Sequence, residues 1–159
     1  MHSDFVDTDA VSWCYWKGME LRGDHALIAL HATDGDIHKG GYVTANKLLW
    51  GLGNFSRFVR PGYVRISLGG ADDLDSVAGS AFLSPDGCRL VMVFVNSSFE
   101  DVDIDISLPK KYTKNISKVE SYRTDARHDL AKTITGEGTS HVIGARGLTT
   151  VVFDLKKFQ

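Results

Sequence analysis

Leu52-Gly-Asn-Phe-Ser-Arg-Phe-Val-Arg-Pro-Gly-Tyr-Val-Arg65 is the stretch in which the chain changes its character. Apolar residues recur with helical spacing from residue 44 to about residue 59, so a helix with one buried face is expected there. Arg57 and Arg60 complement the negative end of the helix dipole, and Pro61-Gly62 ends the helix. Beyond that point, short runs of β-type residues are separated by turn signals. We therefore expect a boundary between residues 61 and 62.

The region after this boundary is predicted to form an antiparallel β-sandwich. Residues 63–68 and 102–108 alternate between apolar and polar side chains, as half-buried strands do. Residues 77–83 are joined to residues 90–95 by the turn Ser84-Pro-Asp-Gly87, and the second of these runs is apolar throughout, so it is expected to be the central strand. Further strands are expected at 118–123, 140–143 and 149–155, giving about seven strands in all, the number a small sandwich uses.

The region before the boundary has a different organisation. Residues 11–16, Val-Ser-Trp-Cys-Tyr-Trp, form an apolar and aromatic run that is typical of a strand buried on both faces. The segment Arg22 to Gly41 is rich in Gly, Asp and His and is longer than most connections in compact domains, which predicts a loop that is functional, disordered or both. The expected order is thus a strand, a loop and a helix.

Composition excludes several classes of protein. A formal net charge of -2, with no basic stripe, argues against a nucleic-acid partner. The apolar runs are far shorter than the roughly 20 residues of a membrane span. The N-terminus is acidic where a secretory signal would be basic and then apolar, so the protein either stays inside the cell or depends on an export signal upstream. Cys14 and Cys88 lie in different contexts and are expected to be unpaired.

These segments together resemble a known family. The stretch 52–65 is similar to the "GxFSKFIRPGxxRI" passage of family 30 glycoside hydrolases, the group of glucosylceramidases, glucuronoxylanases and β-1,6-glucanases. Four further stretches resemble passages of that family in the same order: Trp13-Cys-Tyr-Trp16 its last barrel strand, Leu90-Val-Met-Val-Phe-Val-Asn96 its "VVVxxN" strand, Tyr122-Arg-Thr124 its "YxTS" strand, and Arg146-Gly-Leu-Thr-Thr-Val-Val152 its closing "SxTTxV" strand.

The resemblance implies a fold, an activity and a set of site residues. Residues 1–61 would be the last strand, loop and helix of a (β/α)8 barrel, and residues 62–159 its side β-sandwich. The two catalytic glutamates of the family would fall before Met1, so no catalytic residue is assigned and the chain alone is expected to be inactive. Trp16 matches the strand-end tryptophan that lines the glycone subsite and is assigned to substrate binding, with Trp13, deeper in the strand, as the second candidate and more readily explained by packing. The parent enzyme would be exported.

Other candidate residues have simpler explanations. Glu20 follows the end of the expected strand. A solvated surface charge explains this residue more simply than a contact with sugar does. The acidic and histidine residues of the loop could suit a metal, but their spacing matches no compact ligand motif, so no metal and no cofactor are assigned; they are His25, His31, His38, Asp24, Asp34 and Asp36. Asp72, Asp73 and Asp75 lack the ligand alternation of an EF-hand loop, and a turn is expected there.

Three hypotheses about function remain open. The chain is part of a retaining β-glycosidase for a polysaccharide or glycolipid, or a stand-alone carbohydrate-binding or structural sandwich, or an interaction module whose strand and helix pair with a second copy. Carbohydrate is the expected partner, and it would be bound either weakly by this chain or through the missing part of the barrel. An exposed barrel remnant leaves apolar surface uncovered, so we also expect self-association or partial disorder before Thr44.

Overall fold

The structure of the protein is a computed structural model, and it describes residues 1–70, 76–133 and 139–157. The chain divides into two compact units: an N-terminal unit of residues 3–52 and a C-terminal unit that begins at Gly53. The predicted boundary between residues 61 and 62 concerns which residues belong to a barrel and which to a sandwich, and it stays a prediction.

The N-terminal unit contains a small three-stranded sheet, which follows the short helix α1 (His2–Val6). Strand β1 (Met19–Leu21) runs parallel to β2 (Ile28–Ala32), and β2 pairs antiparallel with β3 (Gly41–Ala45). Two single turns of 3-10 helix, η1 (Thr33–Gly35) and η2 (Ile37–Lys39), connect β2 to β3. The amide of Asn46 donates to the carbonyls of Gly23 and Ala26 at 2.9 and 2.8 Å, which fixes the connection between β1 and β2.

Two predictions for this unit are wrong. Residues 11–16 do not form a strand, and Val11 is 99% exposed. An apolar run becomes a buried strand only when neighbouring strands supply hydrogen bonds on both sides, and within the described ranges no strand pairs with it. The segment Arg22 to Gly41 is not one long loop, because the alternation in Ile28-Ala-Leu-His-Ala32 produces β2 and the glycines Gly40-Gly41, both at positive φ, lead into β3.

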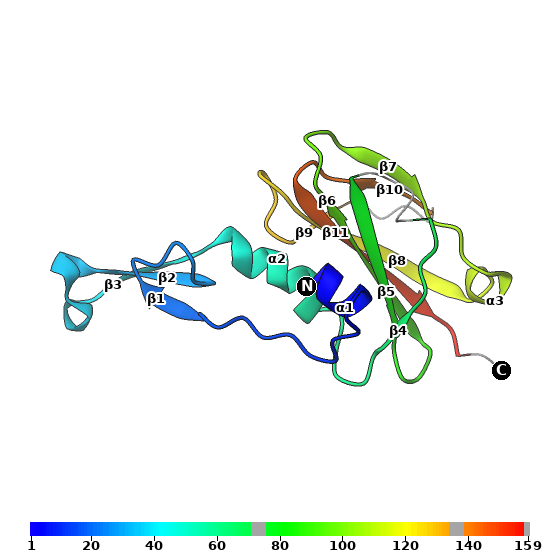
Figure 1. The fold of residues 1–159 in the computed structure, drawn as a ribbon, viewed down its shortest axis with the longest axis horizontal. Helices are drawn as coiled ribbons and strands as arrows, with labels where there is room; N and C mark the ends of the chain where they lie inside the picture. Colours follow the sequence, from blue (N-terminus) through cyan, green and yellow to red (C-terminus); the bar gives the residue numbers. More distant parts are fainter. Residues whose placement is uncertain (71–75, 134–138, 158–159) are drawn as a thin grey trace. The chain divides into compact units, whose positions relative to one another are not determined.

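The C-terminal unit is built on a six-stranded sheet with the order β4-β5-β6-β11-β8-β9 (Figure 1). All neighbouring strands in it are antiparallel. Its strands are β4 (Val64–Ile66), β5 (Val77–Leu83), β6 (Arg89–Asn96), β8 (Ile116–Thr124), β9 (Ala131–Thr133) and β11 (Gly147–Leu155). A second sheet pairs β7 (Val102–Asp105) with β10 (Ser140–Ile143), and a four-residue helix, α3 (Lys110–Thr113), precedes β8.

The main core lies between these two sheets. Side chains alternate along each strand, so Leu90, Met92 and Phe94 of β6 point to the same side as Val151 and Phe153 of β11. The smaller sheet and the segment after it cover them with Val102, Ile104, Ile106 and Ile143. The most deeply buried members, such as Phe153 and Ile143, are 0% exposed. The predicted mainly β fold with an antiparallel sandwich is therefore confirmed.

The opposite face of the large sheet is also covered. Helix α2 (Lys47–Ser56) brings Phe55 against Phe82 of β5, with ring centroids 6.5 Å apart, and Phe58 lies 4.6 Å from the ring of Tyr122 on β8. Gly53 is needed for this close approach, because a Cβ there would come within 2.9 Å of the Leu130 side chain.

Buried Asn54 fixes the end of α2 to the sheet by hydrogen bonds. Its amide nitrogen donates to Thr124 Oγ1 at 2.7 Å, and Thr150 Oγ1 lies 2.9 Å from its amide oxygen and 2.8 Å from its backbone carbonyl. All three side chains are at most 2% exposed. Because buried polar groups are expensive to leave unpaired, this network specifies one position of the helix end on the sheet.

Candidate functional site

Trp13 and Trp16 lie in an irregular segment of the N-terminal unit. Trp16 is 77% exposed, and the ammonium of Lys17 lies over its ring, 4.6 Å from the centroid. Trp13 is half-buried and stacks on Tyr15 with ring centroids 6.0 Å apart. The hydroxyl of Tyr15 donates to the carbonyl of His25 at 2.6 Å, which holds the aromatic segment on the start of the sheet. The assignment of either tryptophan to substrate binding stays a prediction.

Several polar residues that are candidates for catalysis or metal binding form ion pairs, hydrogen bonds or ring contacts within the chain. Glu20 lies on β1 and forms an ion pair with Lys17. His31 Nε2 lies 2.9 Å from Thr44 Oγ1, and its ring stacks on Tyr42 at 4.4 Å. Asp36 accepts a hydrogen bond from the backbone amide of His38 at the start of η2.

No three His, Cys, Asp or Glu side chains come together as metal ligands in the described part of the chain. Asp72, Asp73 and Asp75 lie outside the described residues. Cys14 and Cys88 are both free thiols.

A cluster of charged residues that the sequence did not single out lies at one end of the sandwich. Arg123 on β8 donates through Nη2 to both oxygens of Asp101, at 2.9 and 3.0 Å, and through Nε to Asp125. Asp125 also accepts from the amides of Arg127 and His128 and lies 2.8 Å from His128 Nδ1. Gly144 makes room for the guanidinium, since a Cβ there would lie 2.3 Å from Arg123 Nε. The cluster therefore ties the segment after β8 to the loops around it.

Hydrogen bonding keeps these carboxylates ionised. Burial by itself would raise the pKa of Asp125, but the bonds from the Arg127 amide, His128 and Arg123 outweigh it and lower the pKa to about 2. The Ala145 amide and Arg123 likewise lower the pKa of Asp101. The sequence could not reveal this cluster, because Asp101 lies 22 positions before Arg123 and no sequence pattern links the two.

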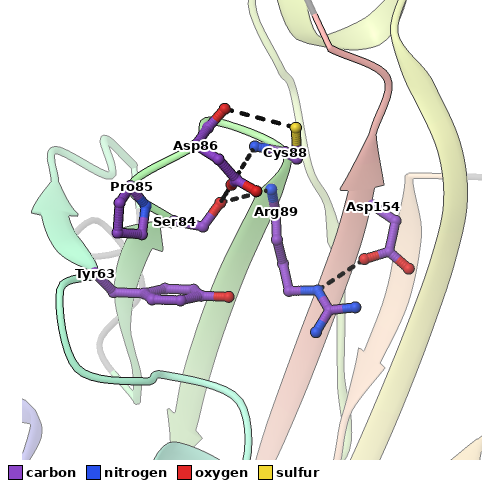
Figure 2. Close-up of a pocket in the computed structure, with 7 residues that line it drawn as sticks. All are labelled: Tyr63, Ser84, Pro85, Asp86, Cys88, Arg89 and Asp154. Atoms are coloured by element: carbon purple, nitrogen blue, oxygen red, sulfur yellow. Dashed lines mark hydrogen bonds and ion pairs between the residues drawn. The ribbon is translucent and has the colours of Figure 1, made fainter.

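A hollow of about 480 Å³ lies at the turn between β5 and β6 (Figure 2). Tyr63, Ser84, Pro85, Asp86, Cys88, Arg89 and Asp154 line it. Strand register explains the grouping. Val64 pairs with Leu83, Leu83 with Leu90, and Arg89 with Asp154, so the ends of four strands meet here in one row.

The turn itself is rigidly held. Asp86 Oδ1 accepts from the Ser84 hydroxyl at 2.6 Å and from the Cys88 amide at 3.0 Å. The backbone amide of Gly87 donates to the Ser84 carbonyl at 2.9 Å, and Gly87 adopts a positive φ of 70°, which glycine allows. The hydrogen bond from the Ser84 hydroxyl is the largest cause of a lowered pKa of Asp86, so its carboxylate is charged. The sequence predicted this turn but not the hollow beside it.

Comparison with known proteins identifies the sandwich. The model of the glycosyl hydrolase family 30 beta sandwich domain matches residues 62–151. The chain belongs to glycosyl hydrolase family 30. The matched residues contain β4 through most of β11, so the family 30 sandwich is the six-stranded sheet together with the β7–β10 sheet.

Solved structures show the same fold. A conserved exported protein from Bacteroides fragilis superposes with a TM-score of 0.76 over 95% of this chain, at 24% identity, and 31% of its own length is covered. A family 30 endoxylanase from Clostridium papyrosolvens C71 matches with a TM-score of 0.57 over 70% of this chain at 26% identity, with 28% of its length covered. The family 30 subfamily 8 xylanase Xyn30A from Clostridium acetobutylicum gives 0.61 over 83% at 20% identity, with 31% covered. The chain thus spans less than a third of each of these proteins.

No helix among the residues that the structure describes is long and apolar enough to cross a membrane.

Proposed function

We propose that this chain is the C-terminal part of a retaining β-glycosidase that acts on a polysaccharide or glycolipid, and that it is inactive on its own. In this proposal, residues 1–61 belong to the end of a (β/α)8 barrel, and residues 62–159 are its side sandwich. The observation that carries the proposal is the family 30 match over residues 62–151 in a chain that spans only 28–31% of solved relatives, two of which are named as xylanases.

The uncovered apolar face of the N-terminal sheet supports this proposal. Strand register places Met19, Leu21, Ile28, Leu30 and Val43 on one face of that sheet. Met19 on β1 and Val43 on β3 are 65% and 64% exposed, which is unusual for apolar side chains on the same face of one sheet. Such a face is expected to be covered by further protein, and a barrel of about 250 residues would supply it.

The state of the carboxylates supports inactivity of the isolated chain. A retaining glycosidase needs two carboxyl groups about 5 Å apart, one of them protonated so that it can act as the acid. Asp101 and Asp125 flank the same guanidinium, but the pKa of each is lowered, that of Asp125 to about 2. Hydrogen bonds from Lys118 and Lys132 lower the pKa of Glu120 to about 2 as well. None of these three groups can donate a proton near neutral pH.

In the same proposal, Trp16 contributes an aromatic face to the sugar site of the complete barrel. An exposed indole is suited to the apolar face of a pyranose. Trp13, stacked on Tyr15, would support the segment rather than contact the sugar.

The test of activity uses the purified chain with aryl β-glucoside, β-xyloside and β-galactoside. Release of the aryl group is expected to equal that in buffer, with an active retaining β-glycosidase as the positive control. Turnover that is abolished by Asp125→Asn or Asp101→Asn would contradict the proposal.

The test of origin is the DNA immediately upstream of the Met1 codon. An in-phase sequence that encodes strand-like segments with two glutamates at strand ends is expected. Upstream DNA without such a sequence would contradict the proposal that the chain belongs to a barrel enzyme.

A further inference from the structure

The hollow between Tyr63, the Ser84–Cys88 turn and Arg89 has no role in the proposed function, because it lies at the end of the sandwich sheet. Antiparallel register pairs Val64 with Leu83, Leu83 with Leu90, and Arg89 with Asp154, and the backbone amide of Ser84 donates to the carbonyl of Arg89 at 2.9 Å. Residues that face each other across antiparallel strands project from the same face of the sheet. Tyr63 directly precedes β4 and Ser84 directly follows β5, so continuing this register places Tyr63, Ser84, Arg89 and Asp154 in one row at the ends of β4, β5, β6 and β11.

This row lies on the face opposite the main core. Leu90, Met92 and Phe94 of β6 point into that core, so the odd-numbered Arg89 points the other way. With strands about 4.8 Å apart, a row across four strands is about 14 Å long. A row of this length suits a short chain of repeating units better than a single small molecule.

The chemistry of the row is that of a polyhydroxylated ligand. Figure 2 shows the ring of Tyr63 on one side of the hollow, the Ser84–Cys88 turn on another, and Arg89 with Asp154 on a third, with the Tyr63 hydroxyl directed toward Arg89. Arg89 donates through Nε to Asp154 Oδ1 at 2.8 Å, and its side chain remains 48% exposed. A half-buried aromatic ring, a guanidinium with further N–H groups and a carboxylate offer a stacking surface, donors and an acceptor to hydroxyl groups.

The charges in the hollow disfavour an anionic ligand. Arg89 is the only cation among the seven residues that line it, and it is already paired with Asp154. Asp86 adds a second negative charge on the same lining. Among these lining residues, an acidic sugar would meet more negative than positive charge and would have to displace Asp154 from Arg89, whereas a neutral sugar can use both groups as they stand. Lys157 is close enough to contribute to the lowered pKa of Asp86 but does not line the hollow.

We propose that this hollow is a non-catalytic binding site for a neutral oligosaccharide, with Tyr63 as the stacking residue and Arg89 and Asp154 as its hydrogen-bonding pair. The choice of carbohydrate rests on the proposed function, whereas the location of the site and its preference for an uncharged ligand rest on the geometry above. The site would hold a glycan chain on the sandwich.

The first experiment follows the backbone amide resonances of the full 159-residue chain during titration with xylohexaose, cellohexaose or an oligogalacturonate. Saturable shifts at Tyr63 and the Ser84–Arg89 turn are expected with at least one neutral oligosaccharide and not with the acidic one. No shift with either neutral sugar at millimolar concentration would overturn the site. Binding of the oligogalacturonate as tight as that of the neutral sugars would also overturn the proposal, and so would shifts confined to Trp16.

Variants separate stacking from general effects of mutation. Tyr63→Ala is expected to weaken binding about tenfold, as loss of one aromatic contact does, whereas Tyr63→Phe keeps the ring and most of the affinity. Phe99→Ala is the matched control, because Phe99 is an exposed ring under an arginine, Arg146, elsewhere on the same unit. Unchanged affinity of Tyr63→Ala, or an equal loss in Phe99→Ala, would overturn the assignment.

The two cysteines provide a second measurement in the same sample. Cys88 lines the hollow and Cys14 does not, so a saturating neutral oligosaccharide is expected to slow alkylation of Cys88 by N-ethylmaleimide and to leave Cys14 unaffected. Equal rates at Cys88 with and without sugar would overturn the site. Failure of either binding test leaves the proposed function standing, whereas aryl glycoside turnover would overturn that function whether or not the hollow binds sugar.

Discussion

The two units of the chain differ in how completely their apolar side chains are buried. In the C-terminal unit, apolar side chains lie on both faces of a six-stranded sheet and both faces are covered, so that Val91, Val93, Val151 and Phe153 are all 0% exposed. In the N-terminal unit, the three-stranded sheet leaves one apolar face largely open. A β-rich apolar sequence is thus compatible with either outcome, and the supply of a covering layer decides between them.

The largest effect on the free energy of unfolding is expected in the sandwich core. Phe153→Ala removes a fully buried ring between the two sheets and should lower the free energy of unfolding by about 3–5 kcal/mol. Chemical denaturation followed by circular dichroism measures it. Phe99→Ala, at a side chain 83% exposed, is the control and should change stability by less than about 0.5 kcal/mol. Similar losses in both variants would contradict the assignment of the core.

The next largest effect concerns the buried polar network under α2. Asn54→Ala leaves the hydroxyls of Thr124 and Thr150 without their amide partner and should cost about 2–3 kcal/mol. Thr150→Val alone should also destabilise, but in the Asn54→Ala background it should cost less, because the two residues share hydrogen bonds. Strict additivity in this double-mutant cycle would show that the network is not a unit.

A pH-dependent effect of about 2 kcal/mol is expected from Asp125. Its pKa is lowered to about 2 in the folded protein, against 3.8 for an ordinary aspartate, so its ionised form stabilises the fold at neutral pH and that contribution disappears as the pH falls from about 4 through 2. Asp125→Asn should therefore be less stable than the parent at pH 7 and nearly equal to it at about pH 2.

Urea unfolding at a series of pH values measures this difference. Asp103→Asn, at an exposed position on β7, is the matched control and should follow the parent within about 0.5 kcal/mol. A difference between Asp125→Asn and the parent that persists undiminished at low pH would contradict the role of the ionised carboxylate.

The smallest effect on stability, and the largest on association, is expected on the open face of the N-terminal sheet. Met19→Lys with Val43→Lys places charge where 65% and 64% of the side-chain surface is exposed and should change unfolding free energy by less than about 1 kcal/mol. If the parent chain self-associates through this face, sedimentation velocity will show concentration-dependent dimers that the double variant lacks. A parent chain that stays monomeric at all concentrations would contradict association through this surface.

Prediction from sequence succeeded where local pattern and tertiary environment agree. The runs 77–83 and 140–143 coincide with β5 and β10, and the apolar run 90–95 lies in β6, an interior strand. Here alternation and turn residues such as Pro85 and Gly87 carry most of the information. Strand β9 was missed because three residues, Ala-Lys-Thr, give no periodicity, and only pairing with β8 makes them a strand.

Prediction failed where the outcome depends on distant partners. The aromatic run 11–16 has the composition of a buried strand but lacks neighbours in the described ranges, whereas residues 28–32 and 41–45 become strands through mutual pairing. The candidate site at Trp16 came from family resemblance, not from pattern. The hollow beside Tyr63 could not be predicted, because strand register brings its members together from distant parts of the sequence. The Arg123 cluster could not be predicted because it depends on Asp101, 22 positions before Arg123.

Strand β11 occupies the middle of the large sheet although it follows the other five strands of that sheet in the sequence. It alone joins the β4-β5-β6 half to the β8-β9 half, pairing with β6 along one edge and β8 along the other. During synthesis on the ribosome, β6 and β8 therefore each keep one edge without a partner strand until Gly147–Leu155 has emerged. A nascent chain stalled before residue 147 would keep both edges open and would be a target for chaperones.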